Sequence, residues 1–290
     1  MGLDMKTLVS VVLYNKTIGE SFTLKSLNCL ENNTFDLVII NNGPSSILND
    51  FKDHGIKIDG STHLLEYLWN KPLSNLYNDV INKNPNYDRY ILLDDDTQIP
   101  NTFIDDLNSN FEESINLHLP LIKNISDNKI YYPRVNNKII DDGILLKNIS
   151  VYNEFHSIGS GLVIYKSLVD IFKKYDLKIF DERFVFYGVD VSIFRRIMFL
   201  KKKHGVIFEI RVVSLLNHSL SEHEANFSEW KKKEMLYADI LMIRHYSENY
   251  FILFARFFKY LLKNLFKFKF KNILISTKIF IKGCHPKSNQ

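Results

Sequence analysis

The segment YILLDDDT, residues 90–97, constrains the fold of this chain more than any other stretch. Its apolar half indicates a buried strand of an α/β sheet, and ligands of such sheets gather beyond the carboxyl ends of the strands. Asp94, Asp95 and Asp96 would then lie where a ligand binds. Because adjacent carboxylates repel one another, they favour a divalent cation or the hydroxyl groups of a ligand. A solvated acidic turn after an edge strand is the alternative when the triplet is taken by itself.

The stretches before this strand alternate between strand-like and helix-like patterns. Apolar runs predict strands at residues 7–13 and 35–40 and a shorter one at 56–58. Apolar residues at helical spacing predict helices over about 20–30 and 73–81. Strands separated by segments of helical length predict a parallel, doubly wound sheet with helices on both faces.

Beyond about residue 100 the pattern changes, and the sheet is expected to become mixed. The predicted elements are a helix over 103–115, strands at 119–122, 130–132 and 162–165, and helices over 168–175 and 191–200. The fold class is therefore α/β, with a mostly parallel sheet at its centre.

Composition excludes some classes of function and setting. With 37 basic and 33 acidic residues the net charge is only +4, so nucleic acid is not an expected partner. Cys29 and Cys284 lie at opposite ends of the chain and form no metal or redox spacing, which favours a reduced, cytoplasmic setting. The first apolar run, residues 8–13, is too short for a signal peptide.

Polar and small residues follow several predicted strands. Asn41 and Asn42 follow the second strand, the three acids end the fourth, Gly161 precedes the strand at 162–165, and Asp190 stands at the start of a helix. These residue types suit a nucleoside diphosphate. Amide groups can read a base, one acid can hold a ribose hydroxyl, another can hold a metal that bridges two phosphates, and glycine backbone can border a sugar.

Four segments resemble motifs of family 2 glycosyltransferases with the GT-A fold: VSVVLYN at residues 9–15, LVIINNGPS at 37–45, LLDDDT at 92–97 and FDERFVFYGVDVSIFRR at 180–196. Within that family, the chain is similar to bacterial enzymes that build cell-surface polysaccharides from rhamnose or galactose donors. The similarity runs from about residue 6 to about residue 225 and continues more weakly to the C-terminus. The resemblance implies a metal-dependent hexosyltransferase.

The resemblance also implies which residues surround the nucleotide. Val12 and Tyr14 lie where the backbone of the family flanks the base. Asn41 replaces the acid that is usual in the family, and its amide could pair with a uracil or thymine edge. Asn78 corresponds to an asparagine near the nucleotide, and Gly161 belongs to the strand on the acceptor side, where it would border the sugar.

The acids and one histidine receive separate roles from the same resemblance. Asp94 would contact the ribose side, Asp96 would bind the cation, Mn²⁺ or Mg²⁺, and Asp95 would stand beside the nucleotide as a solvated acid. His218, in LLNHSLSEH, corresponds to a histidine that completes the metal site in several relatives. A loop histidine with its hydrogen bonds satisfied is the alternative for His218.

Asp190 is the candidate general base. The family usually carries a Glu-Asp pair before a helix, and this chain has Val189 in the first place and keeps the acid in the second. The alternative for Asp190 is a purely structural cap at the N-terminus of that helix.

The C-terminal part, residues 226–290, is expected to be a helical segment attached to a GT-A domain at residues 1–225. A helix over 251–270 carries Arg256, Lys259, Lys263, Lys267 and, just beyond it, Lys271, which form one cationic stripe on an otherwise apolar helix. Such a helix lies in the interface of an anionic membrane. The alternative is a helix packed on its own catalytic domain or on the second copy in a homodimer.

The sequence thus predicts an inverting glycosyltransferase on the cytoplasmic, inner face of the cell membrane. It would move a hexose of the rhamnose, galactose or galactofuranose type from UDP or dTDP to a hydroxyl of a lipid-linked or oligosaccharide acceptor, within a growing surface glycan such as O-antigen or capsule. One alternative is a non-catalytic GT-A relative that serves as a membrane-attached partner in a glycan synthase complex. Another is a nucleotidyltransferase, although residues 13–16 lack the Gly-rich basic loop that binds a triphosphate.

Overall fold

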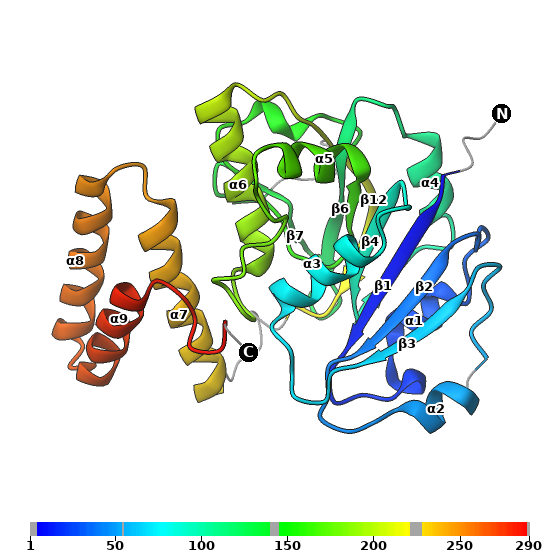
Figure 1. Cartoon of the computed structure of the whole chain (residues 1–290), viewed down its shortest axis with the longest axis horizontal. Helices are drawn as coiled ribbons and strands as arrows, with labels where there is room; N and C mark the ends of the chain where they lie inside the picture. Colours follow the sequence, from blue (N-terminus) through cyan, green and yellow to red (C-terminus); the bar gives the residue numbers. More distant parts are fainter. Residues whose placement is uncertain (1–4, 54, 140–144, 221–227, 289–290) are drawn as a thin grey trace.

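A computed structural model describes residues 5–53, 55–139, 145–220 and 228–288. Its centre is a nine-stranded sheet with the order β3-β2-β1-β4-β11-β6-β12-β5, in which β7 pairs with β6 (Figure 1). The strands are β1 (Thr7–Leu13), β2 (Asp36–Asn41), β3 (Thr62–Glu66), β4 (Arg89–Asp94), β5 (Thr97–Gln98), β6 (Ile115–Asn124), β7 (Ile130–Tyr132), β11 (Leu162–Tyr165) and β12 (Glu209–His218). A second, three-stranded sheet joins β8 (Arg134–Val135), β9 (Lys138–Ile139) and β10 (Phe155–His156).

The first half of the large sheet is parallel, as the sequence predicts. β1 is buried along its whole length and pairs in parallel with β2 on one side and β4 on the other. Its register sets Val12 opposite Asp94, so the acids emerge at the carboxyl end of the central strands. The sheet becomes mixed where β11 runs antiparallel to both β4 and β6, which also confirms the prediction.

Two of the elements predicted in the first 225 residues are wrong in position or length. Residues 56–58 form no strand: the N–H of Lys57 donates to the side chain of Asn28, and the third parallel strand is β3 at the sheet edge. The helix predicted over 103–115 is the shorter α4 (Phe103–Ser109), and Ile115 already begins β6. Parallel pairing of β6 with β12 places this isoleucine in the sheet, a long-range effect that helical spacing does not reveal.

Helices cover both faces of the sheet. They are α1 (Phe22–Leu27), α2 (Leu48–Asp53), α3 (Leu73–Lys83), α5 (Lys166–Lys174) and α6 (Val189–His204), with short 3₁₀ turns η1 (Ile18–Glu20) and η3 (Ile149–Val151). One core cluster joins the sheet to α3, α5 and α6, and a second joins the opposite face to α1 and α4. The predicted doubly wound arrangement is therefore confirmed.

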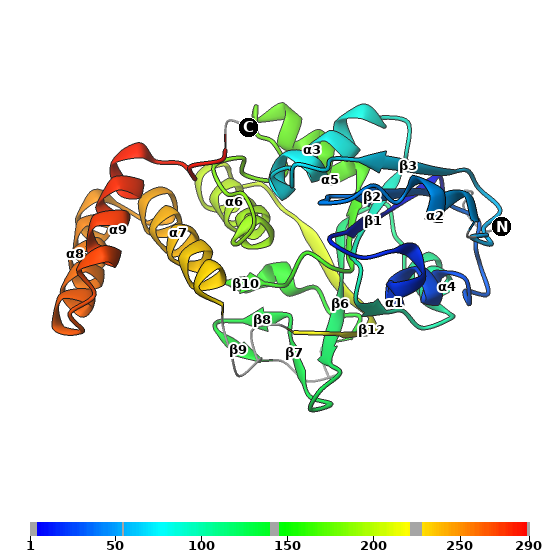
Figure 2. The same ribbon diagram turned by 90° about the horizontal axis from the view of Figure 1, so that it is seen from below.

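The C-terminal residues form three helices, α7 (Glu229–Tyr246), α8 (Tyr250–Phe266) and α9 (Phe270–Lys282), beside α6 and away from β3 (Figures 1 and 2). The helix predicted over 251–270 is confirmed as far as Phe266, where α8 ends, and is wrong beyond that residue. The chain turns at Phe268, whose φ of 53° lies in the left-handed region, and α9 folds back against α7 and α8. Within the described part of the chain, no helix has both the length and the hydropathy needed to cross a membrane. The predicted domain boundary at 225/226 lies outside the described residues.

The buried His118 of β6 makes the stability of this fold depend on pH. Its Nδ1 lies 2.9 Å from the hydroxyl of Tyr165, while its Nε2 has no hydrogen-bond partner among the described residues. Burial, helped by the charges of Arg89 and Arg211, lowers the pKa of His118 to about 3. The unfolded chain has a histidine pKa of about 6.5, so it binds one more proton than the folded chain between the two values.

We expect the free energy of unfolding to fall by a few kcal/mol as pH drops from about 6.5 towards 3, because only the unfolded state can protonate His118. Chemical denaturation of the wild type and of His118→Phe at several pH values measures this contribution, which should be missing from the variant. Replacement of His63, exposed on the edge strand, by Gln is the matched control. Equal pH slopes for wild type and His118→Phe would contradict the prediction.

Candidate active site

A cavity of about 730 Å³ opens at the carboxyl ends of β1 and β4. Its volume lies in the range of small-molecule sites. The residues that line it come from the β1 and β2 ends, the turn before α3, the acidic turn, the loop before α6, the end of β12 and the C-terminal part: Val12, Tyr14, Asn42, Pro44, Leu68, Trp69, Asn70, Leu73, Asp94, Asp95, Asp96, Phe186, Tyr187, His218, Ser219, Trp230 and Lys287.

The acidic turn is held from behind by the start of α1. The Ser21 hydroxyl donates to the carbonyl oxygen of Asp95 at 3.0 Å, and that of Thr23 donates to the carbonyl oxygen of Asp94 at 2.5 Å. The N–H of Thr97 donates back to the Thr23 hydroxyl at 2.9 Å. These bonds fix the backbone of the turn, so the acidic side chains have defined positions before any ligand arrives.

Asp94 is the acid with the most perturbed environment. Burial, opposed by the charge of His218 and helped by that of Asp96, raises its pKa to about 6. The hydroxyl of Tyr77, on α3, donates to Asp94 Oδ1 at 3.3 Å. Burial also raises the pKa of Asp96. The site therefore holds more negative charge than its own residues balance, which favours a cation or hydroxyl donors as ligands.

Asp95 differs from the solvated acid that the sequence predicts. Its Oδ1 lies 2.5 Å from the ammonium group of Lys16, and the N–H of Tyr14 reaches its Oδ2 at 3.5 Å. The ion pair balances the charge of Asp95 and ties the turn after β1 to the acidic turn. Asp95 still lines the cavity, but its main contact is structural.

His218 is the last residue of β12, and the pairing of β12 with β5 sets it opposite Thr97. Its Nδ1 lies 2.9 Å from the hydroxyl of Thr97 and 3.2 Å from Oδ1 of Asp96. The described residues contain no group of three or more His, Cys, Asp or Glu side chains arranged to hold a metal ion. Asp96 and His218 nevertheless fit a cation as a pair of ligands, provided that a bound phosphate supplies further oxygens.

Asn41, the predicted base contact, does not line the cavity. Its amide nitrogen donates to the carbonyl oxygen of Ser45 at 2.7 Å and to Glu66 at 2.9 Å, and its oxygen accepts from the N–H of Gly43 at 3.0 Å. The side chain of Asn41 is therefore fully hydrogen-bonded within the protein, around the turn after β2. The next residue, Asn42, lines the cavity instead.

Two further predicted contacts also lie behind the cavity wall. Asn78 is buried, donates to the carbonyl oxygen of Phe180 at 2.9 Å and accepts from its N–H at 3.0 Å. Gly161 is required by packing, because a Cβ there would stand 2.5 Å from Pro120 and 2.7 Å from Leu216, at a φ of +86°. Both residues shape the protein around the site rather than contacting the space within it.

Asp190 stands in the first turn of α6, one residue after the start of the helix. The N-cap is Gly188, so Asp190 is not the N-cap itself. Its Oδ1 nevertheless accepts a hydrogen bond from the N–H of Val191 at 2.9 Å, so a structural role at the start of the helix stays an alternative. A Cβ on Gly159 would lie 3.7 Å from that of Asp190, and the charge of Asp190 raises the pKa of the Tyr77 phenol, although less than burial does. Asp190 is thus close to the Tyr77–Asp94 pair, but it is not among the residues that line the cavity, whereas Phe186 and Tyr187 of the preceding loop are.

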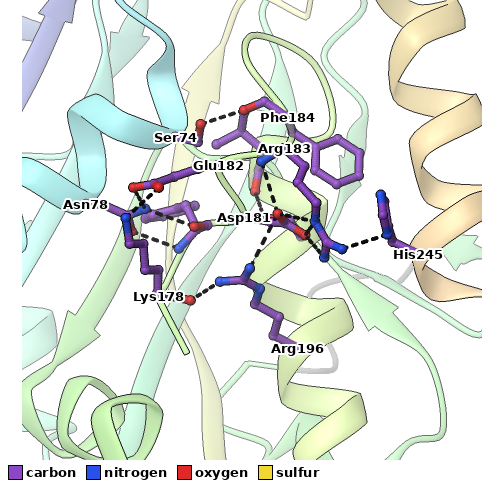
Figure 3. Close-up of polar contacts among 12 residues, drawn as sticks. Ser74, Asn78, Lys178, Asp181, Glu182, Arg183, Phe184, Arg196 and His245 are labelled. Atoms are coloured by element: carbon purple, nitrogen blue, oxygen red, sulfur yellow. Dashed lines mark hydrogen bonds and ion pairs between the residues drawn. The ribbon is translucent and has the colours of Figure 1, made fainter. Parts of the chain in front are cut away.

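A buried ionic cluster holds the loop that leads to Asp190 (Figure 3). Arg183 donates to Asp181 at 2.8 Å through Nε, Arg196 lies 3.4 Å from the same carboxylate, and the Tyr246 hydroxyl donates to it at 2.7 Å. Burial alone would raise the pKa of Asp181, but the two arginines and the tyrosine hold it at about 2. The acids of the FDERF segment therefore fix this loop between α6 and α7.

Sequence reasoning missed several residues of the cavity wall, among them Trp69, Trp230 and Lys287. Trp69 follows β3, whose position was predicted wrongly. Trp230 and Lys287 come from the C-terminal helical part, and no spacing in the sequence connects them with the acidic turn. In the structure the two indoles share a high exposure for so large an apolar side chain, since Trp230 is 52% exposed and Trp69 is 50% exposed.

Solved structures share this fold at low sequence identity. TarS 1–349 from S. aureus aligns with a TM-score of 0.55 and 16% identity over 98% of this chain and 82% of that one. The same protein in complex with UDP-GlcNAc aligns with a TM-score of 0.52 and 15% identity, over 98% of this chain and 83% of that one. GalNAc-T7 with UDP, GalNAc and Mn²⁺ aligns with a TM-score of 0.51 and 13% identity, over 83% of this chain and 49% of that one.

The chain spans 41% of the longer S. aureus TarS structure, with which it aligns at a TM-score of 0.51. No family model matches the chain, and a search of curated proteins finds no match either. TarS and GalNAc-T7 are glycosyltransferases of the GT-A type. At identities this low, the likeness shows the fold alone, which is GT-A-like as the sequence predicts.

Proposed function

We propose that this chain is a glycosyltransferase that takes its sugar from a nucleoside diphosphate. One observation carries the proposal: Val12, Tyr14, the acidic turn and His218 face a single cavity at the carboxyl ends of the central strands. The GT-A-like fold supports it, because TarS and GalNAc-T7 hold UDP-GlcNAc and UDP at the same type of fold.

The donor would lie across the ends of β1 and β4. Val12, Tyr14 and Asn42 would border the base. Asp94 would accept a hydrogen bond from a ribose hydroxyl, because burial leaves its carboxylate poorly solvated and an added donor would stabilise it. Asp96 and His218 would hold Mn²⁺ or Mg²⁺. When bound, such a cation supplies positive charge to the diphosphate as the leaving group departs.

Asp190 would act as the general base of an inverting transfer. It would take the proton of the acceptor hydroxyl while that oxygen forms a bond to the anomeric carbon. The bond from the anomeric carbon to the diphosphate oxygen breaks at the same time, and its electron pair leaves with the nucleoside diphosphate. A single displacement inverts the anomeric configuration. The position of Asp190 beside Gly159 and Tyr77 supports this role.

A donor screen tests the proposed function. The full-length chain is incubated with UDP- and dTDP-sugars, including rhamnose, galactose and galactofuranose donors, and release of nucleoside diphosphate is measured with Mn²⁺ or Mg²⁺ present. Release from one donor is expected. Tight binding of a nucleoside diphosphate without release from any donor would favour the non-catalytic relative, and pyrophosphate release from a nucleoside triphosphate would favour the nucleotidyltransferase.

The proposed setting is the inner face of a membrane, where residues 226–290 contact lipid and residues 1–225 extend a lipid-linked surface glycan. Helices α8 and α9 support it, because they expose a band of aromatic and aliphatic side chains: Tyr250, Phe251, Phe254, Phe258, Leu265, Phe266, Phe268, Phe270 and Leu274. Exposed apolar patches of this kind mark membrane or protein contacts. Exposed basic residues are found in the same region: Lys259 on α8, Lys267 directly after it and Lys271 on α9.

Changing Lys259, Lys267 and Lys271 together to Gln should weaken binding to vesicles that contain anionic lipid by roughly 10²-fold. Each lysine near an anionic leaflet contributes about 1 kcal/mol, and every 1.4 kcal/mol is tenfold in affinity. Binding to neutral vesicles, which rests on the aromatic band, should change little. Co-sedimentation at low and high salt separates the electrostatic contribution of the lysines from the apolar contribution of the aromatic side chains, since salt screens only the electrostatic one.

The matched control replaces Lys173, Lys174 and Lys203, exposed on α5 and at the end of α6, and should leave vesicle binding unchanged. Binding that is indifferent to lipid charge would contradict the interfacial role of the lysines. If the wild type ignores vesicles altogether and sediments as a dimer, the aromatic band covers a second copy of the chain instead.

A further inference from the structure

Three aromatic side chains form one wall of the cavity on the side of Asp190. Phe186 and Tyr187 belong to the loop before α6, and Trp230 stands in the first turn of α7. The ring centre of Trp230 lies 5.7 Å from that of Phe186 and 6.3 Å from that of Tyr187. Trp230 is 52% exposed although an indole is large and apolar. An exposed aromatic face in a cavity suits the apolar C–H face of a sugar ring.

The chain after α9 returns to this wall and is bonded to the loop that carries Phe186. The N–H of His285 donates to the carbonyl oxygen of Arg183 at 2.9 Å. His245, on α7, lies 2.6 Å from Arg183 through Nδ1 and donates to the carbonyl oxygen of Gly283 through Nε2 at 2.7 Å (Figure 3 shows its contact with Arg183). The C-terminal tail is therefore attached to the same ionic cluster that fixes the loop.

A buried Glu–His pair sets the course of the tail. The N–H of Lys287 donates to Nδ1 of His285 at 3.1 Å, so the ring proton of His285 is on Nε2. Nε2 lies 2.9 Å from the carboxylate of Glu234, on α7, and accordingly donates to it. Both side chains are buried. The backbone of Lys287 is thus held in a fixed place beside the aromatic wall.

The ammonium group of Lys287 lies 5.7 Å from the ring centre of Phe186 and borders the cavity. Among the described residues that line the cavity, Lys287 is the only lysine or arginine, and it forms no ion pair with a described carboxylate. The acidic turn belongs to the same cavity and would repel an anion. A negatively charged group that enters the cavity without a metal ion would therefore be drawn to Lys287.

We propose that Trp230, Phe186, Tyr187 and Lys287 form the acceptor subsite, and that it takes a sugar residue carrying an anionic group, a phosphate or a carboxylate. The inference rests on the proposed function and deepens it by naming the class of acceptor. The aromatic wall receives the sugar ring, and Lys287 binds the anionic group. The C-terminal tail is then part of the active site, although it follows the helices proposed to contact the membrane.

The two tryptophans of the chain allow separate readouts for the two halves of the cavity. Trp69 lines it together with Asn42 and Asn70, on the proposed nucleotide side, and Trp230 belongs to the proposed acceptor subsite. Trp230→Phe leaves Trp69 as the fluorescent reporter, and Trp69→Phe leaves Trp230. Both full-length variants are titrated at constant ionic strength with UDP, with galactose, and with galactose 6-phosphate and galacturonate as the anionic probes.

UDP should change the fluorescence of Trp69, and the two anionic sugars should change that of Trp230 at concentrations about tenfold or more below those that galactose requires. A hydrogen bond to a charged group contributes about 1.5–3 kcal/mol, which corresponds to roughly 10-fold to 10²-fold in affinity. Lys287→Gln in the Trp69→Phe background should remove this preference for the anionic sugars. Lys278→Gln, exposed on α9, is the matched control and should keep it.

The possible results separate the inference from the proposed function. If UDP leaves Trp69 unchanged, the proposed nucleotide site fails. If UDP changes Trp69 while Trp230 responds equally to neutral and anionic sugars, or to none, the acceptor subsite is wrong and the nucleotide site stands. Lys287→Gln is also made in the Trp230→Phe background, in which Trp69 reports on UDP. If it weakens UDP binding there, Lys287 binds the donor diphosphate, and the inference about the acceptor is overturned.

Discussion

Asp190→Asn should lower turnover by about 10² to 10⁴, the range for loss of a general base, while the affinity for UDP changes little. The amide keeps the size of the side chain and its place in the first turn of α6 but cannot take the acceptor proton. Turnover is measured as nucleoside diphosphate release at saturating donor, once the donor screen has identified one. Titration of UDP on the same variant measures the binding step.

Asp170→Asn, an exposed change on α5, is the matched control and should retain wild-type turnover. The melting temperature of both variants distinguishes chemistry from folding. Unchanged turnover of Asp190→Asn together with a lower melting temperature would show a structural role for this acid and remove it from the mechanism.

Asp96→Asn should abolish the dependence of activity on a divalent cation and lower turnover by about 10²-fold or more, because several kcal/mol of charge stabilisation are lost and each 1.36 kcal/mol is tenfold in rate. The side chain lies in a cavity wall, so the change opens no void in the core, and the fold should survive. Turnover is measured after chelation and during titration with Mn²⁺ or Mg²⁺.

Asp95→Asn provides the comparison for this prediction. Asp95 is bound to Lys16 rather than to His218, so its variant should keep a cation-dependent rate even if the acidic turn loosens. An Asp96→Asn protein that turns over at the wild-type rate in the presence of chelator would contradict the metal role of Asp96 and His218.

The centre of the fold could be predicted from the sequence because its signals are local. A strand buried on both faces, such as β1, needs an unbroken apolar run whatever its partners are. The acids directly after the apolar run of β4 had to lie at a strand end, which is where α/β sheets bind ligands. Asp94 follows from this reasoning, whereas Val12 and Tyr14 were implied by the family resemblance, and the structure does bring the three together at one cavity.

The ends of elements and the faces of side chains could not be predicted in the same way. In an extended chain, successive side chains point to opposite sides. Of two neighbouring residues, one can therefore face the cavity while the other points into the protein. This alternation separates Asn41, bonded into its own turn, from Asn42, which lines the cavity. Asn78 likewise lies on the side of α3 that faces the loop at Phe180.

The sequence by itself determined the parallel half of the sheet, the helices on both its faces and the acidic turn, since each rests on the spacing of neighbouring residues. Tertiary structure alone decided that Phe268 turns the chain between α8 and α9 and that the tail returns to the cavity. It also brought Trp230 and Lys287 to the same cavity as the acidic turn. Contacts between segments so far apart depend on how whole elements pack, and no local pattern carries that information.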